Sequence, residues 1–216
     1  MKNSVTKYED KNGLPISVIV PLSKNRINFF ESFVLPLIHS NNPKEIIVID
    51  ENETAPKKRN YGFKISTQPY VFFCDDDILL PNNLLKTFHK ELKNNKNVGY
   101  VYCGYKGIVL NPKTHPIKQN YEIKSGEFNP DWLKKSNYIS TMSLIRRQCF
   151  PGFDESLSRF QDWDLYLTML DNGIEGKYIS DKYFIAFYLD DGITSNYNKE
   201  KDSYLKIRKK HNLIRK

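Results

Sequence analysis

The sequence has few cysteines and no long apolar run. Its three cysteines, Cys74, Cys103 and Cys149, are odd in number and widely spaced, so they fit neither a disulfide framework nor a paired metal motif. We expect buried, reduced thiols, because Cys74 and Cys103 lie in apolar stretches. No stretch approaches the roughly 18 apolar residues of a membrane span. The polar N-terminus lacks the apolar segment of a secretion signal. These absences predict a soluble or peripheral protein in a reducing, cytoplasmic compartment.

Positive charge is scarce outside the C-terminal end. The formal net charge is +8, and residues 199–216 carry +6 of it. A nucleic-acid binder is expected to spread basic residues over a folded face, so this distribution argues against nucleic acid as a partner. Two interpretations of residues 196–216 remain open. They form a solvated basic helix or tail, or they make weak contact with an anionic membrane surface.

Short apolar runs alternate with longer mixed stretches in the first half of the chain. Buried strands are predicted where β-branched and aromatic residues dominate, and helices where apolar positions follow helical spacing. The predicted strands are 16–21, 45–50, 70–74, 98–105 and 184–189, and the predicted helices are 27–40 with a break near Pro36, 55–66, 81–92 and 162–170. This order predicts a single α/β domain over residues 1–195, whose mainly parallel sheet is flanked by helices.

Two acidic groups directly follow predicted strands. Asp50 ends one strand, and the triplet Asp75, Asp76 and Asp77 follows another. Ligands of open α/β sheets collect beyond the carboxyl ends of the strands, so both groups are expected to face one crevice. Three adjacent carboxylates repel one another, and a hard divalent cation shared with a phosphate relieves that repulsion. The alternative is an acidic turn that caps the helix after Pro81.

A third acidic segment, from Phe153 to Leu165, stands further along the chain. Asp162 opens a predicted helix among aromatic and apolar neighbours. Partial burial raises the pKa of a carboxyl group toward the range of a general base. The alternative is that Asp162 and Asp164 only stabilise the first turn of that helix.

Five segments in order resemble the inverting nucleotide-sugar glycosyltransferases of the GT-A fold, the large family 2. The resemblance covers roughly residues 15–192, with a nucleotide-sugar half at about 15–105 and an acceptor half at about 106–195. The segments that carry it are ISVIVPLSKNR, EIIVIDENE, KRNYG, YVFFCDDDILLP and GFDESLSRFQDWDLYLTML.

The resemblance implies a donor site. Asp50 would accept a hydrogen bond from uracil, which implies a UDP-sugar, and Pro21 would line the base pocket. Arg59 would lie near the base or the phosphates. Asp75 and Asp76 would hold the ribose and order the loop.

The resemblance also implies a metal ligand and a base. Asp77 would ligate Mn²⁺ or Mg²⁺, although the spacing to Pro81 suits Asp76 equally. Asp162 would deprotonate the acceptor hydroxyl of a glycan or glycoprotein.

The sequence departs from the family pattern at two positions. Gln161 stands where the family usually has glutamate before the base, and Asp190 and Asp191 occupy the region in which the family often has a histidine. Asp191 is a candidate oxygen ligand for the metal, and a simple turn after a strand is the alternative.

Three functions therefore compete at the level of sequence. The first is a metal-dependent, inverting transferase of a hexose from a UDP-sugar. The second is a non-catalytic nucleotide-sugar-binding domain derived from such an enzyme. A nucleotidyltransferase ranks below both, because PLSKNR after the first strand lacks the glycines of a phosphate-binding loop.

Overall fold

A computed structural model describes residues 4–109, 120–123, 125–188 and 197–213. Nine strands of the described part form one sheet in the order β1-β3-β2-β4-β8-β6-β9-β5, with β7 paired to β6. The strands are β1 (Val5–Glu9), β2 (Leu14–Pro21), β3 (Pro43–Ile49), β4 (Tyr70–Phe73), β5 (Ile78–Leu79), β6 (Val98–Val109), β7 (Asn120–Ile123), β8 (Leu144–Arg146) and β9 (Glu175–Tyr188).

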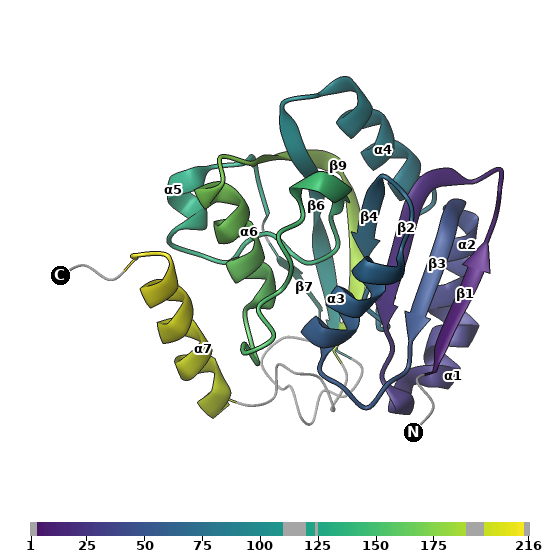
Figure 1. Ribbon diagram of the computed structural model, residues 1–216, viewed down its shortest axis with the longest axis horizontal. Coiled ribbons are helices and arrows are strands. Elements are labelled where there is room, and N and C mark those ends of the chain that lie inside the picture. The colour runs from purple at the N-terminus through teal and green to yellow at the C-terminus, as the bar shows by residue number, and fades with distance from the viewer. Residues whose placement is uncertain (1–3, 110–119, 124, 189–196, 214–216) are drawn as a thin grey trace.

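Helices cover both faces of this sheet (Figure 1). They are η1 (Lys24–Arg26), α1 (Ile27–Phe29), the π-helical η2 (Phe30–Val34), α2 (Leu35–Ser40), α3 (Ala55–Ile65), α4 (Leu84–Asn94), α5 (Pro130–Leu133), η3 (Arg147–Cys149), α6 (Gln161–Asp171) and α7 (Tyr197–Lys210). None of the helices in the described ranges is long and apolar enough to cross a membrane.

The α/β class is confirmed, and the sheet is mixed. Strands β3, β2 and β4 run parallel to one another, as do β6 and β9. The antiparallel strand β8 joins these two groups by pairing with β4 and with β6. The second half of the chain therefore breaks the parallel order that the first half predicts.

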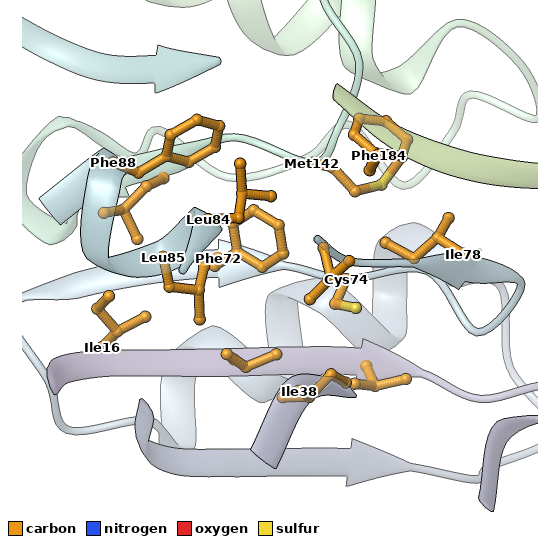
Figure 2. Close-up of a cluster of buried hydrophobic side chains, with 14 of the residues drawn as sticks. Ile16, Ile38, Phe72, Cys74, Ile78, Leu84, Leu85, Phe88, Met142 and Phe184 are labelled. Carbon is orange, nitrogen blue, oxygen red and sulfur yellow. The ribbon is translucent and has the colours of Figure 1, made fainter. Parts of the chain in front are cut away.

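The alternation of side chains along the central strands produces two cores. Val18 and Val20 belong to a cluster with α2 and α4, whereas Ile19 between them belongs to a cluster on the other face with α6. Figure 2 shows part of the first cluster, in which Phe72 packs with Leu84, Leu85 and Phe88 of α4. Burial on both faces explains why these strands are nearly continuous apolar runs.

Most of the predicted elements of the first half are present with shifted ends. The helix expected from Pro81 begins at Leu84, because Asn83 has a positive φ of 63° that a helix does not allow. Pro36 stands in the first turn of α2, directly after the π-helical turn η2. The predicted strand 184–189 is the end of the longer β9, and Leu189 lies outside the described residues.

The polar N-terminus contains the edge strand β1, which the sequence analysis missed. Among the described strands it pairs with β3 alone, and its side chains are exposed or half-buried. The cysteines are free; Cys74 and Cys103 are buried, and Cys149 is half-buried. Burial raises the pKa of the Cys103 thiol to about 12, which keeps it protonated.

Helix α7 packs beside α6 (Figure 1). Ile207 and Ser203 of α7 are buried, and the Tyr204 ring stacks on Trp163 with centroids 5.5 Å apart. His211, directly after α7, bonds Asp164 through Nε2 at 2.9 Å and Asp171 through Nδ1 at 2.6 Å. One face of this basic helix is therefore part of the folded structure.

Candidate active site

A cavity of about 300 Å³ opens at the carboxyl ends of β2 and β4. Its walls come from the loops after these strands, the start of α3, the loop before α6, the segment Ser140–Met142 and the end of β9. Among the residues that line it are Pro21, Ser23, Arg26, Ala55, Arg59, Asp75, Asp76, Asp77, Arg159, Phe160, Gln161 and Asp162. Ile78 and Met142, labelled in Figure 2, join this lining to the apolar core.

The structure brings six of the predicted site residues to this one cavity: Pro21, Arg59, Asp75, Asp76, Asp77 and Asp162. Asp50 is not among the lining residues, although it directly follows β3 at the same edge of the sheet. Asp191 lies outside the described residues.

Arg59 links the two halves of the domain. Its Nη2 donates to Asp75 Oδ1 at 2.6 Å, and its Nη1 donates to Gln161 Oε1 at 2.9 Å. The Arg59 side chain is buried, and its guanidinium lies 5.3 Å from the centre of the Phe153 ring. Gln161 also donates to the Leu157 carbonyl at 3.1 Å. The amide at position 161 thus supplies the acceptor for Arg59 without adding a charge.

Arg26 bridges the other two acids of the triplet. Its Nη1 donates to Asp76 Oδ1 at 2.7 Å and to Asp77 Oδ2 at 2.5 Å. The Ser23 backbone N–H donates to the second oxygen of Asp76 at 2.6 Å. Asp76 is therefore bonded through both oxygens, whereas Arg26 bonds Asp77 through Oδ2.

The electrostatics of the triplet favour an added cation. Burial, followed by the negative charge of Asp75, raises the pKa of Asp77 to about 7. Burial also raises the pKa of Asp76, although Arg26 opposes that shift. Burial and the neighbouring negative charges therefore make a further positive charge favourable beside Asp75 and Asp77, in addition to Arg59 and Arg26. Within the described residues, no group of three or more His, Cys, Asp or Glu side chains is arranged around a metal position.

Asp162 stands in the first turn of α6. Its Oδ1 accepts hydrogen bonds from Asn137 Nδ2 at 2.9 Å and from the Trp163 backbone N–H at 3.0 Å. Burial raises its pKa above the ordinary value, and the two hydrogen bonds and the Arg59 charge act in the opposite direction. Phe160, two residues earlier, has a positive φ of 58°, which is uncommon for an aromatic residue and sharply turns the chain into the helix.

Asp50 has a different environment. Its Oδ1 is buried and has no hydrogen-bond partner among the described residues. The buried Lys58, whose ammonium donates to the Leu22 carbonyl at 2.7 Å, feels the charge of Asp50. A buried acceptor without a donor is costly in a folded protein, so this oxygen suits a ligand that brings an N–H group.

Several lining residues escaped the sequence analysis. Arg26 and Ser23 lie in the loop after β2, which the family resemblance implies as a wall of the base pocket, but neither residue was given a role. The segment Ser140–Met142 carries no recognisable motif. It is held by Tyr166, whose hydroxyl donates to the Ser140 carbonyl at 2.8 Å. The apolar helical spacing of α6 was a usable signal for Tyr166 as a core residue, but nothing in the sequence pointed to its partner.

Comparisons with known proteins identify the family of the chain. Residues 31–151, more than half of the chain, match the family described as Glycosyl transferase family 2. A relative from Haemophilus influenzae, described as an uncharacterized glycosyltransferase, is 23% identical over 173 residues, which are 77% of this chain and 55% of the relative.

Solved structures share the fold. S. aureus TarS 1–349 in complex with UDP-GlcNAc aligns with a TM-score of 0.67 at 16% identity, over 92% of this chain and 65% of TarS 1–349. TarS 1–349 alone gives 0.59 at 16% identity, over 81% and 60%. The chain thus spans between about half and two thirds of these relatives. By its match over residues 31–151 and its GT-A fold, the chain belongs to glycosyl transferase family 2.

Proposed function

We propose that this protein is a metal-dependent, inverting glycosyltransferase that moves a hexose from a UDP-sugar to an acceptor hydroxyl of a glycan or glycoprotein. One observation carries the proposal. The carboxylate of Asp162 and the acidic triplet Asp75–Asp77 line the same cavity, although they come from opposite halves of the chain. In such a cavity Asp162 could act as the base on one side of the sugar, while the diphosphate leaves on the other side, at the acidic triplet.

The donor side would bind the nucleotide through groups that are already oriented. The unpartnered Oδ1 of Asp50 is suited to accept the N3–H of uracil at the same edge of the sheet, and Pro21 lines the cavity. The guanidinium groups of Arg26 and Arg59 lie at the triplet, where they would face the diphosphate. In support, the neighbour TarS was solved in complex with UDP-GlcNAc.

The acceptor side would use Asp162 as the general base. Because Oδ1 is held by Asn137 and Trp163, the proton of the acceptor hydroxyl would pass to Oδ2. The acceptor oxygen then forms the bond to the anomeric carbon as the bond from that carbon to the diphosphate breaks. A well-placed base contributes about 10²–10⁴-fold in rate.

The carboxylates fit a hard divalent ion. Arg26 bonds Asp77 through Oδ2 alone, and Asp75 lies close enough to raise the pKa of Asp77. Asp76 is fully bonded, so we favour Asp77 as the ligand over Asp76. A bound Mn²⁺ or Mg²⁺ supplies neutralisation of the diphosphate charge.

Calorimetry tests the donor site directly. UDP should bind more tightly than GDP, and Mn²⁺ should strengthen the binding of UDP. Asp50→Ala should reduce the preference for UDP over GDP. Equal affinity for UDP and GDP, unaffected by Mn²⁺, would refute the donor assignment.

The base assignment separates an enzyme from a non-catalytic binder. Asp162→Asn should lower sugar transfer by about 10²-fold or more while UDP still binds. Asp131→Asn is a matched control, because Asp131 is an exposed first-turn carboxylate of α5 outside the cavity. If the wild-type protein binds a UDP-sugar tightly but never transfers or hydrolyses the sugar, the result would support a non-catalytic binding domain. The main observation in favour of that alternative is the neutral Gln161.

We also propose that helix α7 belongs to the transferase domain and gives it a weak attraction to anionic membranes. Its exposed side includes Lys201, Lys206 and Lys209. Co-sedimentation with vesicles that contain anionic lipid should fall when these three lysines are replaced by glutamine. Sedimentation that does not change would contradict the membrane contact.

A further inference from the structure

Arg26 occupies an unusual position for a basic side chain in a metal-dependent site. It ends η1 in the loop after β2, and only 10% of its side chain is exposed. One nitrogen, Nη1, lies within 2.7 Å of Asp76 and 2.5 Å of Asp77. The protein therefore already supplies a cation to the carboxylates that the proposed metal would use.

The two carboxylates differ in what else binds them. Asp76 has 4% of its side chain exposed and also accepts the Ser23 N–H, so its bond to Arg26 completes a closed arrangement. Asp77 has 21% of its side chain exposed and lines the cavity. A metal ion that enters from the cavity would reach Asp77 before Asp76. At Asp77 it would also lie close to the positively charged guanidinium of Arg26.

We propose that Arg26 competes with the divalent ion for Asp77. The site without nucleotide would then bind the metal weakly, and the bound nucleotide diphosphate would raise the affinity for the metal. This inference rests on the proposed metal-dependent function. Two cations beside one carboxylate repel each other, so the short bond from Arg26 to Oδ2 weakens the affinity of Asp77 for a metal at either oxygen. That bond must therefore loosen before a metal can bind tightly. A diphosphate supplies negative charge both to the metal and to the released guanidinium, while Asp76 keeps Arg26 in place.

The direct test measures binding of Mn²⁺ alone, from the loss of the free-ion electron paramagnetic resonance signal. Arg26→Gln removes the competing charge, so the variant should bind Mn²⁺ at least about tenfold more tightly than the wild type does. The reason is that the metal-free variant no longer has the hydrogen bond between charged groups that Mn²⁺ must displace. Lys177→Gln is the matched control. It removes one positive charge at the Glu91 pair, near the opposite end of β9, and should leave the Mn²⁺ affinity unchanged.

UDP gives the second half of the experiment. In the wild type, UDP should strengthen Mn²⁺ binding strongly, and in Arg26→Gln this strengthening should shrink, because Mn²⁺ alone already binds well. Equal or weaker binding of Mn²⁺ alone to Arg26→Gln overturns the competition. If neither the wild type nor Arg26→Gln binds Mn²⁺ even with UDP present, the proposed metal-dependent function itself is wrong. That result is distinguishable from failure of the competition, in which both proteins bind Mn²⁺ with UDP.

A measurement on the wild type covers the case in which Arg26→Gln does not fold. Arg26→Lys keeps a positive charge beside the buried Asp76. The guanidinium signals that are present in the NMR spectrum of the wild type and absent from that of Arg26→Lys belong to Arg26. Adding saturating Mg²⁺ with UDP to the wild type should shift these signals, because the guanidinium exchanges its bond to Asp77 for a bond to the diphosphate while it stays bonded to Asp76. Arg26 signals that stay unchanged at saturation contradict the proposal.

Discussion

Gly62 in helix α3 gives the sharpest test of how packing positions the donor site. A Cβ atom at this position would lie 2.4 Å from Ile19 Cγ2 and 2.9 Å from Ile49 Cδ1. Both isoleucines are fully buried, in β2 and β3. Distances below 3.0 Å require a shift of the helix or of the isoleucines, so the glycine allows α3 to approach the sheet.

Two opposing effects decide the outcome of Gly62→Ala. Alanine is favoured over glycine in a helix interior by about 1 kcal/mol. Overpacking of a well-packed core costs about 1–3 kcal/mol, and the clash here involves branched side chains in a strand rather than a flexible chain end. We therefore expect a net loss of about 1–2 kcal/mol in the free energy of unfolding.

Urea denaturation followed by circular dichroism measures this change. Lys64→Ala, an exposed substitution on the same helix, should change stability by no more than about 0.5 kcal/mol. The double variant Gly62→Ala/Ile19→Ala should show favourable coupling of about 1 kcal/mol, because the second change removes the clashing methyl group. A Gly62→Ala protein more stable than the wild type would refute the reasoning, since helix propensity would then have prevailed over the close approach.

Three further predictions concern α7 and the base. Ile207→Ala should lower the free energy of unfolding by about 2–4 kcal/mol, whereas Leu205→Ala on the exposed side of α7 should change it by less than about 0.5 kcal/mol; equal losses in urea denaturation would mean that α7 is not docked. Burial raises the pKa of Asp162, so kcat/KM should fall on acidification with an apparent pKa above 3.8, and a rate that is flat down to that pH would argue against this base. The carboxylates of Asp164 and Asp171 raise the pKa of His211 above 6.5, so its contribution to stability is complete below pH 6.5 and is lost as the pH rises through the higher folded pKa. His211→Gln should reduce that loss of stability above pH 6.5, and an unchanged pH profile would contradict it.

The first half of the fold was predictable because its strands are buried on both faces. Runs such as 16–21 and 45–50 leave little ambiguity, and acids directly beyond a strand end must lie at the edge where ligands bind. The position of Asp75–Asp77 beside Asp162 followed from the resemblance to a family and not from any local pattern. The edge strand β1 was missed because a polar strand with one neighbour has no apolar signal.

Contacts between distant residues account for most of what the sequence did not predict. Arg59 and Gln161 are 102 positions apart, and Arg26 and Asp76 are 50 apart. Local periodicity carries no information about which guanidinium meets which carboxylate. His211 likewise reaches Asp164 across 47 positions, so a basic C-terminal segment that appears solvated in the sequence has a docked face in the structure.

The charges around the cavity are the basis of our proposal that the donor and the metal enter together. Three carboxylates, Asp75–Asp77, face two fixed guanidinium groups, Arg26 and Arg59, and these arginines make short bonds with all three acids. A free divalent ion would displace a bonded arginine, and a free diphosphate would meet Asp75 and Asp77 at the cavity wall. A metal–diphosphate pair carries little net charge, and it offers oxygens to the arginines and a cation to the acids at the same time. In the proposed mechanism this arrangement favours the loaded nucleotide over either of its parts, and Asp162, held separately by Asn137, would remain available as the base.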